Sequence, residues 1–210
     1  MHIVITGDLK SSRKIDNRYL SQDNLKNAIQ YLNSTFRKHL ISEFRIVGGD
    51  GFQGMISRSD IILEIYFSLF QKIKHPFYLG VGIGSISTQL SDFVQEIDGE
   101  AFHLSSEALN FAKKKNRWFI LRSNLRNNND LIECVFNFMF EIIWKWTERR
   151  REIILFYRNH GENPQAIEMA SIKFETGTRN IYKTLEVGQY NLVKYGETVL
   201  KRELMENYSF

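Results

Sequence analysis

The sequence predicts an α+β protein with two parts: a split βαβ, ferredoxin-like domain in residues 1–126 and a small all-α domain in residues 127–210. Three observations predict this organisation. Through about residue 125 the spacing of apolar side chains changes repeatedly between a period of two and a helical period, in the order β-α-β-β-α-β-α-β. The segment SNLRNNNDL then favours turn conformations, and every later segment has helical spacing.

The strands of the first domain are short runs rich in β-branched and aromatic residues, separated by helical runs. The first strand, HIVIT, precedes a helix with apolar side chains at Leu25, Ile29, Leu32 and Phe36. In a split βαβ arrangement the helices cover one face of a mostly antiparallel sheet, which leaves the other face or the hairpin edge free for a ligand. The remaining strands are expected at EFRIV, FQGMI, PFYLGVGIGSIS and RWFILRS.

The second domain is expected to contain a long helix from about Asp130 to Asn159, a break at HGENP, and further helices. Pro164 suits the first turn of a helix, and Thr178 opens another helix after the turn at Gly177. This is the layout of a helix-turn-helix. The apolar side chains expected to face its core, at least in part, are Ala166, Ile167, Ala170, Ile172, Ile181, Leu185 and Leu192.

Composition indicates a soluble, folded, cytoplasmic protein. Hydrophobic residues make up 43% of the chain and charged residues 25%, and the start MHIVITGDLK predicts a strand rather than an export signal. The single cysteine, Cys134, allows no disulfide within the chain and indicates a reducing compartment. No apolar run is long enough to span a bilayer, so no membrane partner is expected.

Positive charge is concentrated in the first part of the chain. The net charge is +4, with 17 Lys and Arg against 12 Asp and Glu in residues 1–129, and 11 against 12 in residues 130–210. A nucleic-acid surface in the second domain must therefore be a local face, because that domain has no bulk positive field.

Two aspartates are expected to meet at one edge of the sheet. Asp8 follows the first strand, and Asp50 lies in the Gly-Gly-Asp-Gly turn between the next two strands. In a split βαβ sheet the first strand lies beside that hairpin, so the two carboxylates converge and could hold Mg²⁺ together with nucleotide phosphates. Each aspartate also has a structural interpretation, since Asp is common in glycine-rich turns and at strand ends.

The same segments resemble known families. GGDGF resembles the GGDEF hairpin of diguanylate cyclases, and the first domain is similar to class III nucleotide cyclase and palm-type catalytic domains. ITGDLKSSR, GGDGFQ, GVGIG and DGEAFHLSSEAL together resemble the SatD family of bacterial proteins, over most of the chain. The resemblance implies metal binding by Asp8 and Asp50. The nucleotide-binding residues expected with them are Gly48, Gly49, Gly51, Arg13 and His103.

Departures from the cyclase pattern argue against cyclase activity. The positions of the transition-state asparagine and arginine are occupied by His103 and Glu107, and that of the base-selecting lysine by Ile46. A carboxylate cannot stabilise negative charge on phosphorus as an arginine does, because the sign of the interaction reverses. We therefore assign no catalytic residue. We expect the domain to bind a metal-nucleotide complex without cyclising the nucleotide.

The helix-turn-helix layout predicts contacts with DNA. Arg179, Asn180, Lys183 and Thr184 would face outward near the start of the second helix, where a recognition helix meets the major groove, and a homodimer would supply the affinity. The predicted function is a transcription regulator with a degenerate cyclase-like sensor domain. The alternatives are a Mg²⁺-dependent nucleotide-processing enzyme that uses Asp8 and Asp50, and a non-catalytic protein-interaction module.

Overall fold

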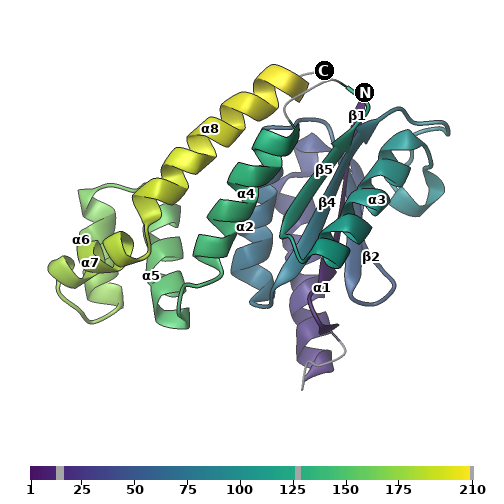
Figure 1. Ribbon diagram of the computed structural model, residues 1–210. Helices are drawn as coiled ribbons and strands as arrows, with labels where there is room; N and C mark the ends of the chain where they lie inside the picture. Colours follow the sequence, from purple (N-terminus) through teal and green to yellow (C-terminus); the bar gives the residue numbers. More distant parts are fainter. Residues whose placement is uncertain (13–16, 126–128, 209–210) are drawn as a thin grey trace. The chain divides into compact units, whose positions relative to one another are not determined.

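A computed structural model describes residues 1–12, 17–125 and 129–208 (Figure 1). The order of strands and helices predicted for the first 125 residues is observed. The elements are β1 (His2–Leu9), α1 (Arg18–Thr35), η2 (Arg37–His39), β2 (Leu40–Val47), β3 (Gly51–Ile56), α2 (Ile62–Ile73), β4 (Phe77–Gly84), η3 (Val94–Glu96), α3 (Glu100–Lys115), β5 (Phe119–Ser123), α4 (Asn129–Ile143), α5 (Glu148–Asn159), α6 (Pro164–Lys173), α7 (Thr178–Val187) and α8 (Tyr190–Tyr208).

The chain divides into two compact units. The sheet unit comprises Met1–Asn137 together with Leu200–Phe210, and the helical unit comprises Phe138–Val199. Both divisions fall inside helices, within α4 and α8. The boundary predicted between residues 126 and 127 lies outside the described residues.

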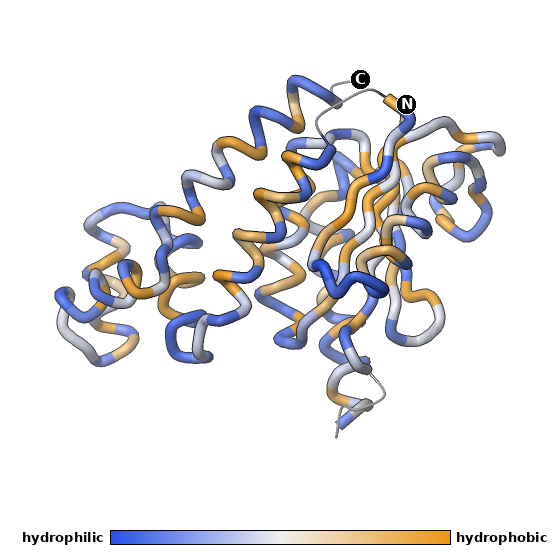
Figure 2. The backbone as a smooth tube through the Cα atoms, in the orientation of Figure 1, coloured by the Kyte–Doolittle hydropathy of each residue, from blue (hydrophilic) through white to orange (hydrophobic). Residues whose placement is uncertain are grey.

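The sheet unit is built around five strands in the order β2-β3-β1-β4-β5. β1 is antiparallel to both of its neighbours, β3 and β4, and β2 is antiparallel to β3. Only β5 runs parallel to its neighbour, β4. The fold is therefore a mixed α+β arrangement with β1 at the centre. Figure 2 shows that the central strands are predominantly hydrophobic, as buried strands require.

Helices lie on both faces of this sheet, so of the two places expected to be free for a ligand, a whole face of the sheet is not free, whereas α3 does not cover the hairpin strands β2 and β3. α1 and α2 lie on one face, and α3 lies over β4, β1 and β5 on the other (Figure 1). Parallel strands need a crossover connection, and the connection between β4 and β5 is α3. α3 lies so close to β4 that only glycine fits at positions 80 and 82. A Cβ at Gly80 would lie 2.4 Å from the amide nitrogen of Leu109, and a Cβ at Gly82 would lie 2.2 Å from the carbonyl oxygen of Ala101.

Side chains pair with the backbone along both outer strands of the sheet. On β5 the carboxamide of Asn137 accepts from the Trp118 amide at 2.7 Å and donates to the Phe119 carbonyl at 2.8 Å. On β2 the carboxamide of Asn33 accepts from the Phe44 amide at 2.8 Å and donates to its carbonyl at 2.9 Å. An amide side chain thus takes the place of a neighbouring strand and reduces the tendency of an open edge to recruit another chain.

The helical unit begins with an interruption that the sequence pattern did not predict. The expected single helix from Asp130 to Asn159 is wrong, because α4 ends at Ile143 and α5 starts at Glu148. Thr147 caps α5 by accepting a hydrogen bond from the Arg150 amide at 3.3 Å.

The later helices of this unit begin where the sequence predicted. Pro164 occupies the first turn of α6, with Asn163 as its N-cap, and α7 begins at Thr178. α5, α6 and α7 share one apolar core, whose buried members are Ile153, Ile167, Ala170, Phe174 and Ile181.

Candidate functional site

The hairpin between β2 and β3 brings the two predicted metal-binding aspartates to one end of the sheet. Asp8, near the end of β1, is paired in register with Gly51, the residue that follows Asp50. The amide of Leu9 donates to the carbonyl of Asp50 at 3.2 Å. Two carboxylates that are 42 residues apart in the sequence are therefore neighbours, as predicted.

The glycines of the hairpin have different structural reasons. Gly48 and Gly49 have φ angles of 65° and 91°, a region that L side chains rarely adopt, so the turn itself requires them. At Gly51 the constraint is space: a Cβ would lie 3.0 Å from the Val47 carbonyl and 3.5 Å from Oδ1 of Asp8. The missing side chain of Gly51 therefore leaves room directly beside the carboxylate of Asp8.

A lysine from α3 completes the cluster. Nζ of Lys113 lies 2.8 Å from Oδ2 of Asp8, whose side chain is 18% exposed, and the hydroxyl of Ser12 donates to Oδ2 of Asp50. The sequence analysis assigned no role to Lys113 or to Ser12. The run of three lysines at the end of α3 was the available signal, because the helix returns to the end of β1 where Asp8 lies.

The positive charge of Lys113 does not fully offset the effects of burial and of Asp50 on the pKa of Asp8. Burial raises the pKa of Asp8, the neighbouring charge of Asp50 raises it further, and Lys113 opposes both effects. The cluster of Asp8, Asp50 and Lys113 holds two carboxylates against one ammonium group. We refer to these three residues as the hairpin cluster.

Asp8 and Asp50 of the hairpin cluster could hold a hard divalent cation only if the cation brings other ligands with it. Carboxylate oxygens are the ligands that Mg²⁺ prefers, and the Lys113 ammonium already places one positive charge against Asp8. Within the described residues no group of three or more His, Cys, Asp or Glu side chains could enclose a metal. Asp8 and Asp50 would therefore supply part of the coordination shell, and phosphate oxygens or water the remainder.

The predicted nucleotide-binding residue His103 does not join the hairpin cluster. His103 lies in the first turn of α3, with a side chain 76% exposed and 3.5 Å from Asp98. It precedes Lys113 by ten residues, which is about 15 Å along a helix. Glu107 is also exposed on α3. Arg13 lies outside the described residues.

The predicted DNA-binding residues are on α7 in the helical unit. Arg179, Asn180 and Lys183 are exposed, whereas Thr184 is half-buried and donates to the Asn180 carbonyl at 2.8 Å. Ile181, between them, is fully buried in the shared core. α7 therefore exposes polar side chains to solvent on one face and packs Ile181 into the core on the other.

Two expectations about apolar side chains of the helical unit need correction. Leu192 is 55% exposed and belongs to α8, because the helix that opens at Thr178 ends at Val187 and a new helix begins at Tyr190. Ile172 is 78% exposed rather than partly inward. Arg149 donates to the carbonyl of Phe174 at 2.5 Å and lies over its ring. Arg149 thus stabilises the end of α6.

A shallow cavity of about 370 Å³ lies away from the hairpin cluster, along the outer edge of β2. It does not include Asp8 or Asp50. Its lining is mainly polar and consists of Lys26, Ile29, Gln30, Asn33, Glu43, Phe44, Arg45, Ile46 and Gln95.

No helix in the described part of the chain has the length and apolar character needed to cross a membrane.

Comparisons with known proteins identify a family and include a weak structural likeness. The model described as the SatD family matches residues 2–183. A solved structure of a bacterial light-regulated adenylyl cyclase is similar with a TM-score of 0.44 and 10% sequence identity, covering 57% of this chain and 74% of that one. The comparison with curated proteins gave no match.

Proposed function

The chain belongs to the SatD family, and we propose that its sheet unit binds a Mg²⁺–nucleotide complex at the hairpin cluster as a sensor that does not cyclise the nucleotide. The observation that supports the proposal is the convergence of Asp8, Asp50 and Lys113 at the end of the central strand. The ligand state of the sheet unit would then regulate the activity of the helical unit in a cytoplasmic regulator.

Charge balance favours this ligand class. Two carboxylates and one ammonium leave an excess of one negative charge, which a divalent cation would over-neutralise. Phosphate oxygens would restore the balance and accept hydrogen bonds from Lys113. The bound Mg²⁺ would supply the positive charge that bridges the carboxylates and the phosphates.

The groups needed for cyclisation are missing from the site. By the cyclase resemblance, the positions of the transition-state asparagine and arginine are His103 and Glu107, and Glu107 has the wrong sign of charge. Binding without turnover is therefore the activity that this set of residues supports.

The proposal is tested by ligand-induced stabilisation. Mg²⁺ with ATP or GTP, and Mg²⁺ with cyclic dinucleotides, should raise the unfolding temperature of the wild type but not of the Asp8→Asn and Asp50→Asn variants. Saturation at one hundred times Kd corresponds to about 2.7 kcal/mol of stabilisation. Asp23→Asn, an exposed carboxylate on α1, is the matched control and should respond as the wild type does.

Two outcomes would contradict the proposal. One is the absence of any stabilisation by these ligands in the wild type. The other is equal stabilisation in the Asp8→Asn and Asp50→Asn variants. Chromatography of the same mixtures after prolonged incubation separates binding from turnover, and nucleotide conversion that disappears in Asp50→Asn would support the alternative of a Mg²⁺-dependent enzyme.

DNA binding by the helical unit is the second candidate function. It rests on Arg179, Asn180 and Lys183, which are exposed on α7 while Ile181 anchors that helix in the core. The unit carries nine Lys and Arg against eight Asp and Glu, a net charge of +1, so binding would depend on this face and on dimerisation.

A selection from genomic fragments tests the second candidate. DNA should be retained by the wild type, and retention should fall in the double variant Arg179→Ala/Lys183→Ala. Lys145→Ala, an exposed lysine on the segment after α4, controls for the loss of positive charge alone. Recovery of no DNA, or equal recovery by the double variant, would exclude this function.

A further inference from the structure

A chain of polar side chains crosses the sheet face beneath α3. Nε2 of Gln53 on β3 donates to Oγ1 of Thr6 on β1 at 2.9 Å, and the two residues are paired in register. Oγ1 of Thr6 lies 2.9 Å from Oγ of Ser105 on α3. The hydroxyl of Ser105 donates to the carbonyl of Phe102 at 3.0 Å.

Counting hydrogens fixes the direction of this chain. Ser105 has one hydroxyl hydrogen, and it is used on the carbonyl of Phe102, so Thr6 must donate to Ser105. Thr6 then has no hydrogen left to give, and its oxygen can only accept from Gln53. The carboxamide of Gln53 is therefore held with one N–H inward, and among the described residues no other group pairs with its carbonyl oxygen or its second N–H.

Gln53 lies at a part of the sheet that α3 does not cover. α3 packs on β4, β5 and β1, and η3 lies against β2 and β3. The buried apolar cluster at η3 includes Met55 of β3. Thr6 and Ser105 are buried, whereas Gln53 is half-buried. The oriented amide thus lies between the covered part of the face and the hairpin cluster.

The separation from the hairpin cluster matches the size of a nucleoside. Gln53 is two residues beyond Gly51 and on the same face of β3, which places it about 7 Å along the strand from the level of Asp8. A ligand whose phosphates lie at Asp8 and whose sugar and base extend along β3 would reach the amide of Gln53.

We propose that Gln53 recognises the nucleoside part of the ligand, with Thr6 and Ser105 as the residues that orient its amide. This inference rests on the proposed function and specifies the ligand as a nucleotide rather than an inorganic polyphosphate. A hydroxyl or base edge that offers both a donor and an acceptor pairs with the carbonyl oxygen and N–H of the amide. Apolar side chains at these positions would leave no buried polar group in need of a hydrogen-bond partner. Stability alone therefore does not require the hydrogen-bonded series of Gln53, Thr6 and Ser105.

Matched ligands test the inference. Binding of Mg²⁺-ATP, Mg²⁺-GTP and Mg²⁺-tripolyphosphate is measured by calorimetry on the full chain, for the wild type and for Gln53→Met, which has similar volume and no amide. The affinity for at least one nucleotide should fall about tenfold in Gln53→Met, the loss expected for one or two hydrogen bonds. The affinity for tripolyphosphate should stay within twofold.

A second variant isolates the orienting role. Thr6→Val removes the acceptor that holds the inward N–H of Gln53 and keeps the shape of the side chain. Its nucleotide affinity should fall less than that of Gln53→Met, its tripolyphosphate affinity should be unchanged, and the double variant should be no weaker than Gln53→Met. The unfolding temperature without ligand confirms that each variant is folded.

The outcomes separate the two proposals. If Gln53→Met keeps its affinity for every nucleotide, or loses nucleotide and tripolyphosphate affinity equally, the role of Gln53 is wrong while the hairpin cluster remains a binding site. If the wild type binds tripolyphosphate and nucleotides equally well, the nucleoside is not recognised. If the wild type binds none of the three, the proposed function is wrong and the inference is overturned with it.

Discussion

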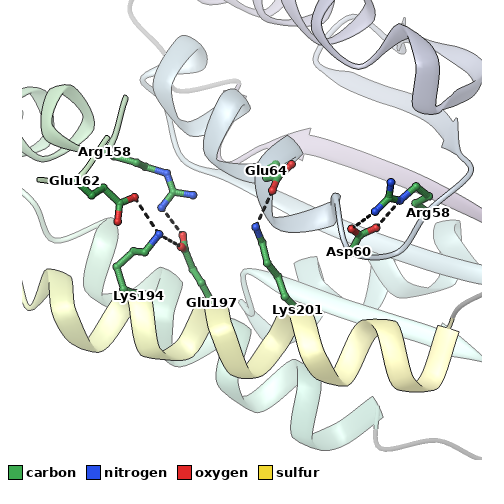
Figure 3. A network of polar contacts seen from close by, with 8 residues as sticks. All are labelled: Arg58, Asp60, Glu64, Arg158, Glu162, Lys194, Glu197 and Lys201. Carbon is green, nitrogen blue, oxygen red and sulfur yellow. Dashed lines mark hydrogen bonds and ion pairs between the residues drawn. The ribbon is translucent and has the colours of Figure 1, made fainter. Parts of the chain in front are cut away.

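Two clusters of charged side chains, one in each unit, differ in how completely their charges are balanced. In the part of the chain that the structure describes, the hairpin cluster sets Asp8 and Asp50 against a single cation, Lys113. In the helical unit, Glu197 and Glu162 face two cations, and Figure 3 shows Lys194 between the two carboxylates. A balanced cluster can serve the fold, whereas we propose that the unbalanced cluster takes up an added cation.

Distances and burial sharpen the contrast. Glu197 is only 4% exposed and lies 2.6 Å from Nη1 of Arg158 and 3.1 Å from Nζ of Lys194. Lys194 also lies 2.9 Å from Glu162. A buried carboxylate needs such partners because its desolvation costs several kcal/mol. Asp8 is more exposed and is paired with one cation, and its pKa is raised by burial and by Asp50.

The largest effect is expected from breaking the balanced cluster. Glu197→Ala leaves Arg158, whose side chain is 15% exposed, without its carboxylate partner and should lower the free energy of unfolding by about 3–5 kcal/mol. Urea unfolding monitored by circular dichroism measures the change. Glu162→Gln, at a carboxylate that is 28% exposed, should cost about 1 kcal/mol or less. Equal effects of the two variants would show that burial does not govern the cluster.

Removing a charge from the unbalanced cluster should affect ligand binding rather than the fold. Asp8→Asn should change the free energy of unfolding without ligand by less than about 1 kcal/mol. The stabilisation by Mg²⁺-nucleotide, about 2.7 kcal/mol at one hundred times Kd, should be lost. Parallel urea titrations with and without ligand measure both quantities. A destabilisation as large as that of Glu197→Ala would assign Asp8 a structural role.

The raised pKa of Asp8 predicts a pH-dependent difference between wild type and Asp8→Asn. A carboxyl group whose pKa is higher in the folded state stabilises the fold at pH values below its unfolded-state pKa, about 3.9. This stabilisation is lost as the pH rises through the folded-state pKa. Relative to Asp8→Asn, the wild type should therefore lose stability between pH 3.5 and pH 7.

Unfolding experiments at the two pH values measure this difference, with Lys113→Met as a further variant. Lys113 lowers the pKa of Asp8, so the removal of Lys113 should enlarge the loss of stability between the two pH values. A wild type that gains stability relative to Asp8→Asn as the pH rises would show that the pKa of Asp8 is lowered in the folded protein.

The smallest effect is expected from a balanced but exposed pair in the sheet unit. Nζ of Lys201 lies 2.7 Å from Glu64, and both side chains are about 40% exposed (Figure 3). Lys201→Met should change the free energy of unfolding by no more than about 0.5 kcal/mol, because water screens exposed ion pairs. Urea unfolding checks this value, and a loss above about 2 kcal/mol would show that balance stabilises the fold regardless of burial.

Much of the candidate site could be predicted from the sequence. Asp8 and Asp50 were identified because strand order and a glycine-rich turn determine where a short segment places its side chains. Lys113 and Ser12 were missed because their roles depend on contacts between distant segments. His103 was assigned to the site by resemblance, but it lies at the opposite end of α3 from Lys113.

The sequence by itself determined the order of strands and helices in the first 125 residues, the hairpin at Asp50, and the starts of α6 and α7. Periodicity, proline and turn residues act over a few neighbouring positions, so these features can be predicted locally. Only the tertiary structure decided that α3 covers the second face of the sheet, that Lys113 meets Asp8, and that Gln53 is oriented through Thr6. These features depend on how segments far apart in the chain pack, and that packing leaves no local pattern in the sequence.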